Sequence, residues 1–529
     1  MLINPTLGLF APRDSSRLRS GSIEPFVCAG WGDESDSGGL MHNEWVDFLF
    51  ECKLPVLALG LRGGNALSSS DEPELIFNPF SVGSYRNFLV MYCSFVDGLD
   101  RGIRFPMIYI LKTQFGLSQA VAFTAMGVSL SPWFLKPLLA LLTDTIPVFG
   151  LRRKPYIIGS AFVNALSLSL IGYFSITHIG GFLVPMSLMT LRTVTRCITG
   201  SVAQGMLLED CRDRPQSYTS VLMSQYHTSH RMGQFLSVCA SGWLLTSGSI
   251  TEIFASMAGF HAVSIMLAFA LHEEPPTVFQ NSATLDDIPY KMDELGALVT
   301  EQPPFRQVLE YAFLAMASPT YEARMAYYLL DDRGLSVWQV SLVTIAQTVA
   351  ATITPIFYSM WFQNASLFPL MNRFTVGTVP ASLLPLVLTT GLYSYLGLSK
   401  WTETLVAAGS GFFLTLSTDL QMMPANVLVA QLSARGLEGS SFSLFTVVEG
   451  IGRVCSNFSS GLLPLLLGAS ATNGYANMSL YIIACSAFQL APLVTTGNTI
   501  EEPIPEELEK PLKYADSSLI QTPNVIDDI

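Results

Sequence analysis

Long apolar segments alternate with short polar loops over most of the chain from Tyr85 onward. Each segment has about 20–28 residues, the length that a helix needs to cross ~30 Å of hydrocarbon. Helices satisfy their own backbone hydrogen bonds inside a bilayer, and they tolerate the frequent Gly and Pro seen here. The pattern predicts twelve membrane-spanning helices, near residues 85–112, 117–142, 155–176, 180–208, 217–247, 250–271, 305–331, 336–362, 368–396, 401–432, 439–468 and 475–497.

Polar segments divide the chain into five parts. Residues 1–80 are rich in Gly, Ser, Asp and Glu, and their one apolar stretch is too short to span, which predicts a mostly disordered cytoplasmic tail. Two acidic segments follow later, with seven acidic residues and one lysine in 272–304, and eight acidic residues and two lysines in 498–529. We therefore expect six-helix bundles at 81–271 and 305–497, joined by an acidic cytoplasmic loop and followed by an acidic cytoplasmic tail.

Composition supports a multi-span membrane protein and excludes several other classes. Half of the residues are hydrophobic and 13% are charged, whereas soluble domains carry about 25% charged residues. The net charge of −13 comes almost wholly from the acidic loop and tail, which argues against nucleic acid as a partner. No phosphate-binding loop, nucleophile elbow or metal triad is visible, and we expect no enzyme, no cofactor and no metal site.

The distribution of Lys and Arg predicts the orientation. With both termini in the cytoplasm, the inner loops carry nine of these residues and the outer loops carry three. Cationic loops stay cytoplasmic, so this count favours cytoplasmic termini. We expect a monomer in the lipid bilayer, with the plasma membrane as its location.

The two halves of the chain repeat. The segment Tyr109–Ser118 aligns with Tyr327–Ser336 at an offset of 218, and Met232-Gly233 aligns with Ile451-Gly452 at an offset of 219. Two parallel six-helix repeats with a substrate site between them are a known plan for transporters. The fold predicted is all-α, with twelve transmembrane helices in two pseudo-symmetric six-helix bundles.

The loop in SPWFLKPLLALLTDTIPVFGLRRKPY, residues 131–156, carries an acid, a turn and a basic cluster between two apolar segments. It resembles the signature loop of the major facilitator superfamily, and its Pro-Trp-x-x-Lys-Pro and Gly-x-Arg-Arg-x-Pro-Tyr runs resemble the folate-biopterin transporter family. The stretch 199–212 is similar to the fourth-helix motif of that family, except that Gly200 and Gln204 stand where the family has aspartates. The resemblance covers residues 85–470 or so. It implies a gating role for five residues: Asp144, Arg152, Arg153, Glu209 and Arg212.

Ionisable groups inside spans are costly and are therefore candidate site residues. The first span carries Asp97, Asp100, Arg101 and Arg104, which can form two i,i+4 pairs with the acid first. The pairs could simply neutralise each other and so lower the free-energy cost of membrane insertion. Alternatively, they could line a central cavity and exchange a proton. Both interpretations remain open.

The fourth span carries Arg192 and Arg196 with no acid partner on the same helix. One hypothesis is that they attract an anion, since arginine binds carboxylate and phosphate bidentately. The alternative is that Arg192 snorkels, or that it pairs with Asp97 or Asp100 across helices. The other candidates for the substrate site are Lys136, Gln204, Arg231, Glu322 and Asp419.

Together, these observations predict a secondary transporter of a small organic anion. The resemblance implies folate or a pterin as substrate, alternating access, and protons as a coupling ion. A different anionic metabolite, such as a carboxylate, amino acid or phosphate compound, remains an alternative. So does a membrane receptor or scaffold that has lost transport.

Overall fold

The computed structural model describes residues 84–496, with gaps at 118, 178–179, 213, 248–249, 274–286, 391–398 and 470–474. The expected segments 1–80 and 498–529 lie outside the described residues. The predicted helical fold is confirmed. The first half contains α2 (Tyr85–Arg101), α3 (Arg104–Thr113), α4 (Gln119–Ser129), η1 (Ser131–Leu135), α5 (Lys136–Thr145), α6 (Lys154–Thr177), α7 (Leu183–Cys211), α8 (Gln216–Ser247) and α9 (Ile250–Ala270). The second half contains α11 (Pro303–Ala317), α12 (Glu322–Asp331), α13 (Val337–Trp361), α14 (Leu367–Leu383), α15 (Leu386–Thr389), α17 (Lys400–Leu432), α18 (Glu438–Leu467), α19 (Met478–Phe488) and α20 (Leu493–Thr496).

Several predicted spans are interrupted rather than continuous. The first breaks between α2 and α3 around Gly102, and the seventh breaks between α11 and α12 around Pro319. These breaks fall at equivalent places in the repeat. A Cβ on Gly102 would lie 1.8 Å from Ser237 Oγ, so the chain approaches α8 closely there. Proline lacks an N–H and cannot continue a helical ladder, which explains the break at Pro319 and the 3-10 turn of η1 at Pro132.

One helix was not predicted. Helix α10 (Asp287–Glu301) lies in the segment expected only to be an acidic loop. Its Leu295 and Leu298 are buried, while Tyr290 and Met292 are exposed. The signal was present in the sequence, because apolar residues recur at helical spacing among its acidic residues.

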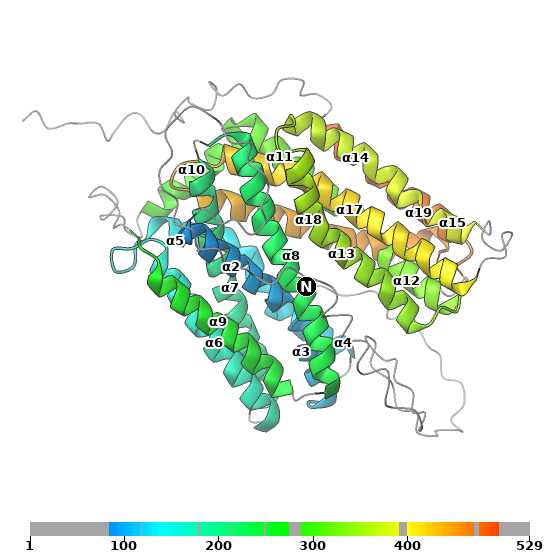
Figure 1. Ribbon diagram of the computed structural model, residues 1–529, viewed down its shortest axis with the longest axis horizontal. Coiled ribbons are helices and arrows are strands. Elements are labelled where there is room, and N and C mark those ends of the chain that lie inside the picture. The colour runs from blue at the N-terminus through cyan, green and yellow to red at the C-terminus, as the bar shows by residue number, and fades with distance from the viewer. Residues whose placement is uncertain are drawn as a thin grey trace, which may run out of the picture.

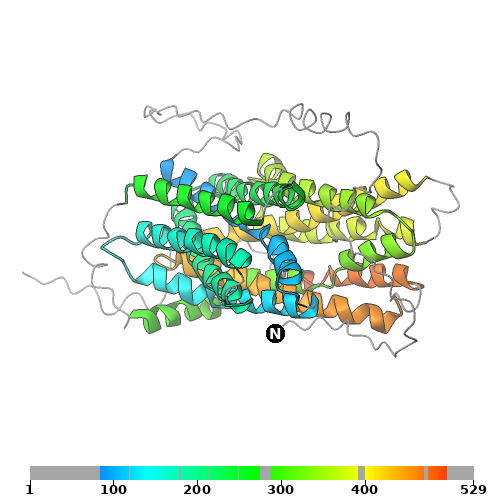
Figure 2. The same cartoon turned by 90° about the horizontal axis from the view of Figure 1, so that it is seen from below.

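The two halves lie side by side in both views (Figure 1, Figure 2). They converge at the end that holds α5 and α10, and they diverge towards the end that holds α3, α4 and α12 (Figure 1). We call the first the Asp144 end, because Asp144 lies at the last turn of α5. Our sequence-based orientation places the Asp144 end in the cytoplasm.

The internal repeat is visible in the packing. Ser237 Oγ donates to the Leu99 carbonyl at 2.6 Å in the first half, and Ser456 Oγ donates to the Ser318 carbonyl at 2.6 Å in the second. Each residue of the first pair lies 219 positions before its counterpart in the second pair. The repeat found in the sequence is therefore a repeat of helix contacts.

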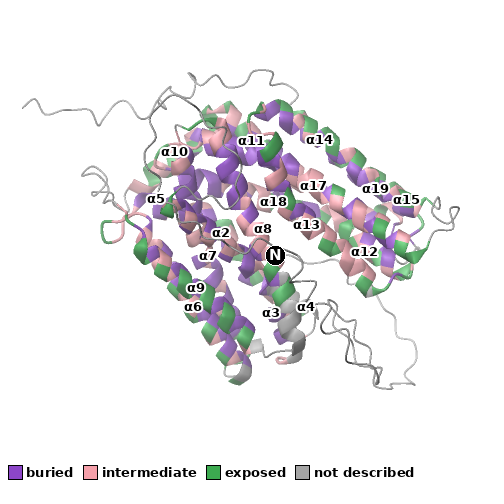
Figure 3. Ribbon diagram, in the orientation of Figure 1, coloured by how far each residue is buried: buried purple, intermediate pink, exposed green. Residues whose placement is uncertain are grey.

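The outer faces of the bundle expose large apolar side chains, as the exposed positions on α6 and α9 show (Figure 3). Soluble monomers rarely expose such extended apolar surface, whereas a bilayer covers it. Examples are Phe162, Leu166, Met266 and Phe269. Five stretches of the described chain are long and apolar enough to cross a membrane by length and composition alone. Many of the other predicted spans are broken, or carry the ionisable residues considered below.

Candidate functional site: a charged gate and a polar centre

A tight turn returns the chain to Asp144. Val148 and Leu151 exchange two backbone hydrogen bonds of 3.0 Å, with Phe149 and Gly150 between them at φ 53° and 74°. Positive φ at both central residues is typical of a type I′ turn. Glycine adopts this conformation without steric cost. The turn places the basic residues that follow beside the end of α5.

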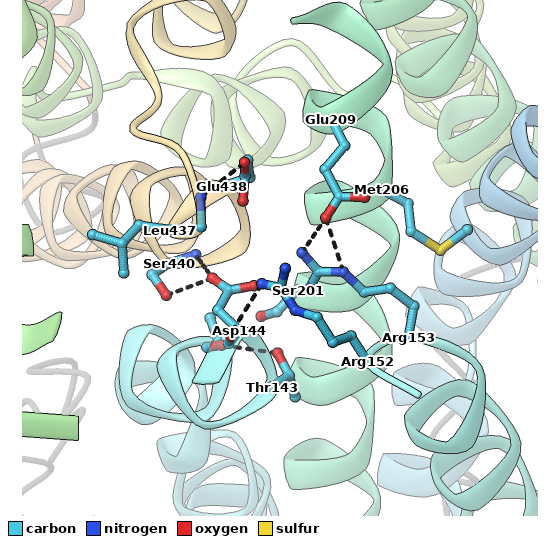
Figure 4. Close-up of polar contacts among 12 residues, drawn as sticks. Thr143, Asp144, Arg152, Arg153, Ser201, Met206, Glu209, Leu437, Glu438 and Ser440 are labelled. Carbon is cyan, nitrogen blue, oxygen red and sulfur yellow. Dashed lines mark hydrogen bonds and ion pairs between the residues drawn. The ribbon is translucent and has the colours of Figure 1, made fainter. Parts of the chain in front are cut away.

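Asp144 joins the two halves at this end (Figure 4). Its carboxylate accepts from Arg153 Nη1 at 2.7 Å in its own half. In the other half it accepts from the backbone N–H of Ser440 at 2.8 Å and from Ser440 Oγ at 2.7 Å. Ser440 lies in the first turn of α18, where unpaired N–H groups favour an anion. A buried carboxylate of one half therefore caps a helix of the other.

The basic partners of Asp144 are themselves held in place. Arg153 Nη2 bonds Glu209 at 2.6 Å, and Arg152 Nη2 donates to the Asp144 carbonyl at 2.8 Å. Burial lowers the pKa of Arg153, but the charges of Asp144 and Glu209 outweigh burial and hold this pKa above its usual range. A Cβ on Gly205 would lie 3.0 Å from Arg153, so a larger residue would crowd the guanidinium. We call Asp144, Arg152, Arg153, Glu209 and Ser440 the gate cluster.

Further contacts tie the halves together near the gate cluster. Arg212 forms an ion pair with Glu438 of α18. Ser201 and Ser443 share a hydrogen bond of 2.9 Å. All five residues for which the sequence implies a gating role thus lie at the Asp144 end.

Four charged residues form a second group inside the first half. Asp100 pairs with Arg192, and its other oxygen lies 3.2 Å from Arg196 Nε. Asp97 lies 2.6 Å from Arg196 Nη2. His230 and His261 lie 3.4 Å and 3.3 Å from these acids. We call Asp97, Asp100, Arg192 and Arg196 the buried ion cluster.

The buried ion cluster corrects two expectations from the sequence. The first was that Asp97 and Asp100 pair within their own helix, but both pair across to α7. The second was that the arginines of α7 are free to attract an anion. The alternative of pairing across helices, which the sequence left open, is confirmed. The side chain of Arg104 lies outside the described residues.

A third group of charges lies at mid-depth and comes from both halves. Glu449 lies within electrostatic range of four cations, Arg101 on α2, Lys136 on α5, Arg231 on α8 and Arg453 on α18. We call these four cations the central basic cluster. Glu449 is eleven residues beyond the start of α18, which is ~16 Å along the helix axis.

The members of the central basic cluster differ in exposure and in partners. Lys136 is buried and donates to Gln204 at 2.8 Å and to Thr446 of the other half at 3.1 Å. Arg231 is partly exposed and meets Asp419 of the other half at 2.8 Å. The side chain of Arg453 is 54% exposed and lies 3.5 Å from Glu449. Arg101 is half-buried.

Several partners of these charged residues could not be predicted from the sequence. Nothing in the spacing ties Ser440, His230 or His261 to acids that are more than a hundred residues away. Glu438 stands directly before the predicted eleventh span, but its position in the sequence does not point to Arg212 as its partner. Glu322 does not join the charged groups above. It lines a separate cavity in the second half.

The pattern of the BT1 family matches residues 97–518 of this chain. The chain belongs to the BT1 family. Among its relatives, a protein of Plasmodium berghei (strain Anka) named "Putative folate transporter 2" is 25% identical, with 84% of this chain and 95% of the relative aligned. The "Folate-biopterin transporter" of a Synechocystis strain is 25% identical, over 78% of this chain and 81% of the relative. These relatives are transporters and not enzymes.

Solved structures show the same fold. The proton:xylose symporter XylE superposes with a TM-score of 0.57 at 14% identity, covering 79% of this chain and 96% of that one. The human organic anion transporter MFSD10 (TETRAN) gives a TM-score of 0.57 at 13% identity, covering 78% and 99%. The BT1-family chain therefore has the fold of the major facilitator superfamily.

Proposed function

We propose that this BT1-family protein is a secondary active transporter of folate or a pterin, and that it recognises the anionic part of the substrate. The names of its relatives support the substrate class. The observation that carries the choice of an anion is the central basic cluster, in which Arg453 is 54% exposed and lies 3.5 Å from Glu449. A water-poor centre strengthens such charge contacts.

The cations that we assign to substrate binding are those with accessible side chains. Arg453 is more than half exposed, and its contact with Glu449 is long at 3.5 Å. Arg101 is half-buried and lies within electrostatic range of Asp97. A carboxylate of the substrate could bind either guanidinium bidentately. Arg192 and Arg196 already have acid partners, so in this proposal they organise α2 and α7.

The gate cluster supplies the conformational part of the proposal. With Asp144 bonded to α18, the halves are held together at that end, and they diverge at the other (Figure 1). Alternating access would require Asp144 to leave Ser440 while Arg153 remains its partner. We assign the Asp144 end to the cytoplasm, from the positive-inside count. The protein would act as a monomer in the plasma membrane.

Proton coupling is part of the proposal, through Asp97. The side chain of Asp97 is 25% exposed, whereas that of Asp100 is 1% exposed. It also lies beside His230 as well as Arg196. A proton on Asp97 would weaken its hold on Arg196, which would alter the contact between α2 and α7.

Uptake into liposomes tests the proposed function. Purified protein is reconstituted, and entry of radiolabelled folate is followed with and without an inward proton gradient. We expect saturable uptake, inhibited by excess unlabelled folate and more weakly by biopterin, which lacks the glutamate tail. Competition by unrelated carboxylates or phosphates, with none by folate, would favour a different anionic metabolite. No uptake of any compound, together with retained folding, would contradict a transport function.

A further inference from the structure

The second half contains a cavity of about 240 Å³. It lies among α12, α13 and α17, and its walls are mainly apolar, with Tyr321, Met325 and Leu414 among them. Two polar side chains stand out in the lining. Glu322 and Gln347 lie 3.4 Å apart and both line this cavity.

The repeat allows this cavity to be compared with the fourth span of the first half, α7. At an offset of 218, Arg192 corresponds to Ser410 and Arg196 corresponds to Leu414. Both replacements line the cavity. In the first half these two positions of α7 carry guanidiniums, which pair with acids of α2. In the second half, the smaller uncharged side chains of Ser410 and Leu414 leave room for a ligand.

The cavity adjoins the interface between the halves. Glu322 lies within electrostatic range of Asp419. Asp419 in turn pairs with Arg231 of the other half at 2.8 Å. Along α17, Ser410 lies nine residues from Asp419, which is ~13 Å. An elongated molecule could therefore reach from this cavity to the central basic cluster.

Resting on the proposed function, we propose that this cavity binds the heteroaromatic ring of the substrate, and that Glu322 accepts two hydrogen bonds from the 2-amino-4-oxopyrimidine edge. That edge carries an amino group and a ring N–H side by side, and a carboxylate presents two acceptor oxygens with matching spacing. Gln347 offers both an acceptor and donors to the remaining ring positions. The apolar walls suit a flat bicyclic ring, as ligand pockets with few polar groups do.

This assignment divides recognition between the halves. The uncharged ring would occupy the cavity beside Glu322, and the anionic tail would reach Arg453 and Arg101. The carboxylate of Glu322 in the cavity would repel the anionic tail of the substrate. The substrate would therefore bind with its ring, and not its tail, in the cavity. Different residues would therefore recognise the two ends of folate, and recognition of each end can be tested separately.

Two fragments separate the two subsites. Biopterin carries the ring without the glutamate tail, and p-aminobenzoyl-glutamate carries the tail without the ring. Binding of each fragment, and of folate, is measured by displacement of labelled folate from the purified full-length protein. The variants are Glu322→Gln, which removes one acceptor, and Thr344→Phe, which fills the cavity at an exposed lining position. The exposed Glu301 on α10, changed to Gln, is the matched control.

We expect Glu322→Gln and Thr344→Phe each to weaken biopterin and folate binding about tenfold or more, and to leave p-aminobenzoyl-glutamate binding within twofold. Glu301→Gln should change none of them. If folate binds and neither cavity variant alters biopterin binding, the ring subsite is wrong while the proposed function stands. If Glu322→Gln changes the pH dependence of uptake without changing biopterin binding, the ring subsite is also wrong, because Glu322 would then bind a proton and not the ring. If neither folate nor biopterin binds the wild-type protein, the proposed function itself fails.

Discussion

The two halves repeat the same helices but make equivalent contacts with different chemistry. At the Asp144 end, the carboxylate of Asp144 accepts from Ser440 at 2.7 Å. The position 219 residues after Asp144 is Gln363, whose backbone carbonyl accepts from Ser220 at 3.3 Å. One half thus contributes a buried, ion-paired acceptor, and the other contributes a neutral carbonyl at the surface of a loop.

The same difference recurs in the interior. In the first half, α7 contributes arginines to the buried ion cluster, whereas α17 of the second half lines the cavity beside Glu322. A buried charge that loses its partner is expensive, whereas a neutral contact is weak and easily replaced. We infer that the first half carries the switching charges, and that the second half provides a neutral framework and space for the substrate.

The largest expected effect on the rate of transport comes from the gate cluster. In Asp144→Asn, the amide keeps one acceptor but loses the charge that caps α18 and pairs with Arg153. Because charged hydrogen bonds contribute about 1.5–3 kcal/mol, turnover should fall roughly tenfold to a hundredfold, with little change in KM. Initial rates of folate uptake, corrected for the amount of reconstituted protein, measure this.

The control for that variant is Asp293→Asn, an exposed acid on α10 in the segment that joins the two halves. It should transport at the wild-type rate. Wild-type kinetics in Asp144→Asn would show that the gate cluster does not hold the closed end during transport.

The buried ion cluster should dominate stability. Arg192 is 2% exposed, and Arg192→Leu leaves Asp100 without its main partner. Breaking a buried pair typically costs about 3–5 kcal/mol, whereas replacing both partners costs less. We expect Arg192→Leu to lower the thermal unfolding temperature in detergent strongly, and Asp100→Leu/Arg192→Leu to recover part of the loss. A double variant less stable than either single one would contradict the pairing.

Proton coupling should give an intermediate effect. Uptake should rise several-fold as external pH falls from about 7.5 to 5.5, a range that also spans the ordinary histidine pKa. Asp97→Asn should flatten this dependence while the protein remains folded. Glu252, an acid in the first turn of α9, changed to Gln, serves as the control. Uptake independent of pH in the wild-type protein would exclude coupling through Asp97 and His230 alike.

The neutral hydrogen bonds between α8 and the loop after α13 should have the smallest effect on transport. Gln216 Nε2 donates to the Ala365 carbonyl at 2.8 Å, across the halves. A neutral hydrogen bond contributes about 1 kcal/mol net, so Gln216→Ala should slow uptake by less than about tenfold. If Gln216→Ala slows uptake as much as Asp144→Asn, the two gates are equivalent and the comparison fails.

The fold was predictable because its signals are local or periodic. Span lengths, the repeat and the basic loop identify twelve helices, and boundaries such as those of α6 and α13 follow within a residue or two. The breaks at Gly102 and Pro319 were not predicted. Hydropathy alone does not show that a helix packs closely at Gly102, or that Pro319 lacks the N–H needed to continue the helix. The gate at Asp144 was predictable from its motif, but its partner Ser440 was not.

The ion pairs within the buried ion cluster could not be predicted from the sequence. Local spacing paired Asp97 with Arg101, four residues away, whereas its hydrogen-bonded partner is Arg196, ninety-nine residues away. Tertiary packing of α2 against α7 decides between them. The cavity beside Glu322 was equally hidden, because an empty volume is a property of several helices together.

The most direct test of the account is the charge dependence of substrate selection at Arg453. Folate and biopterin uptake are compared in proteoliposomes for the wild type, Arg453→Gln and the control Arg306→Gln, whose arginine is similarly exposed and also pairs with a glutamate one turn away. We expect Arg453→Gln to raise the KM for folate about tenfold, because a charged hydrogen bond is lost, and to leave the KM for biopterin nearly unchanged. Equal changes for folate and biopterin, or no change for either, would contradict recognition of an anion by the central basic cluster.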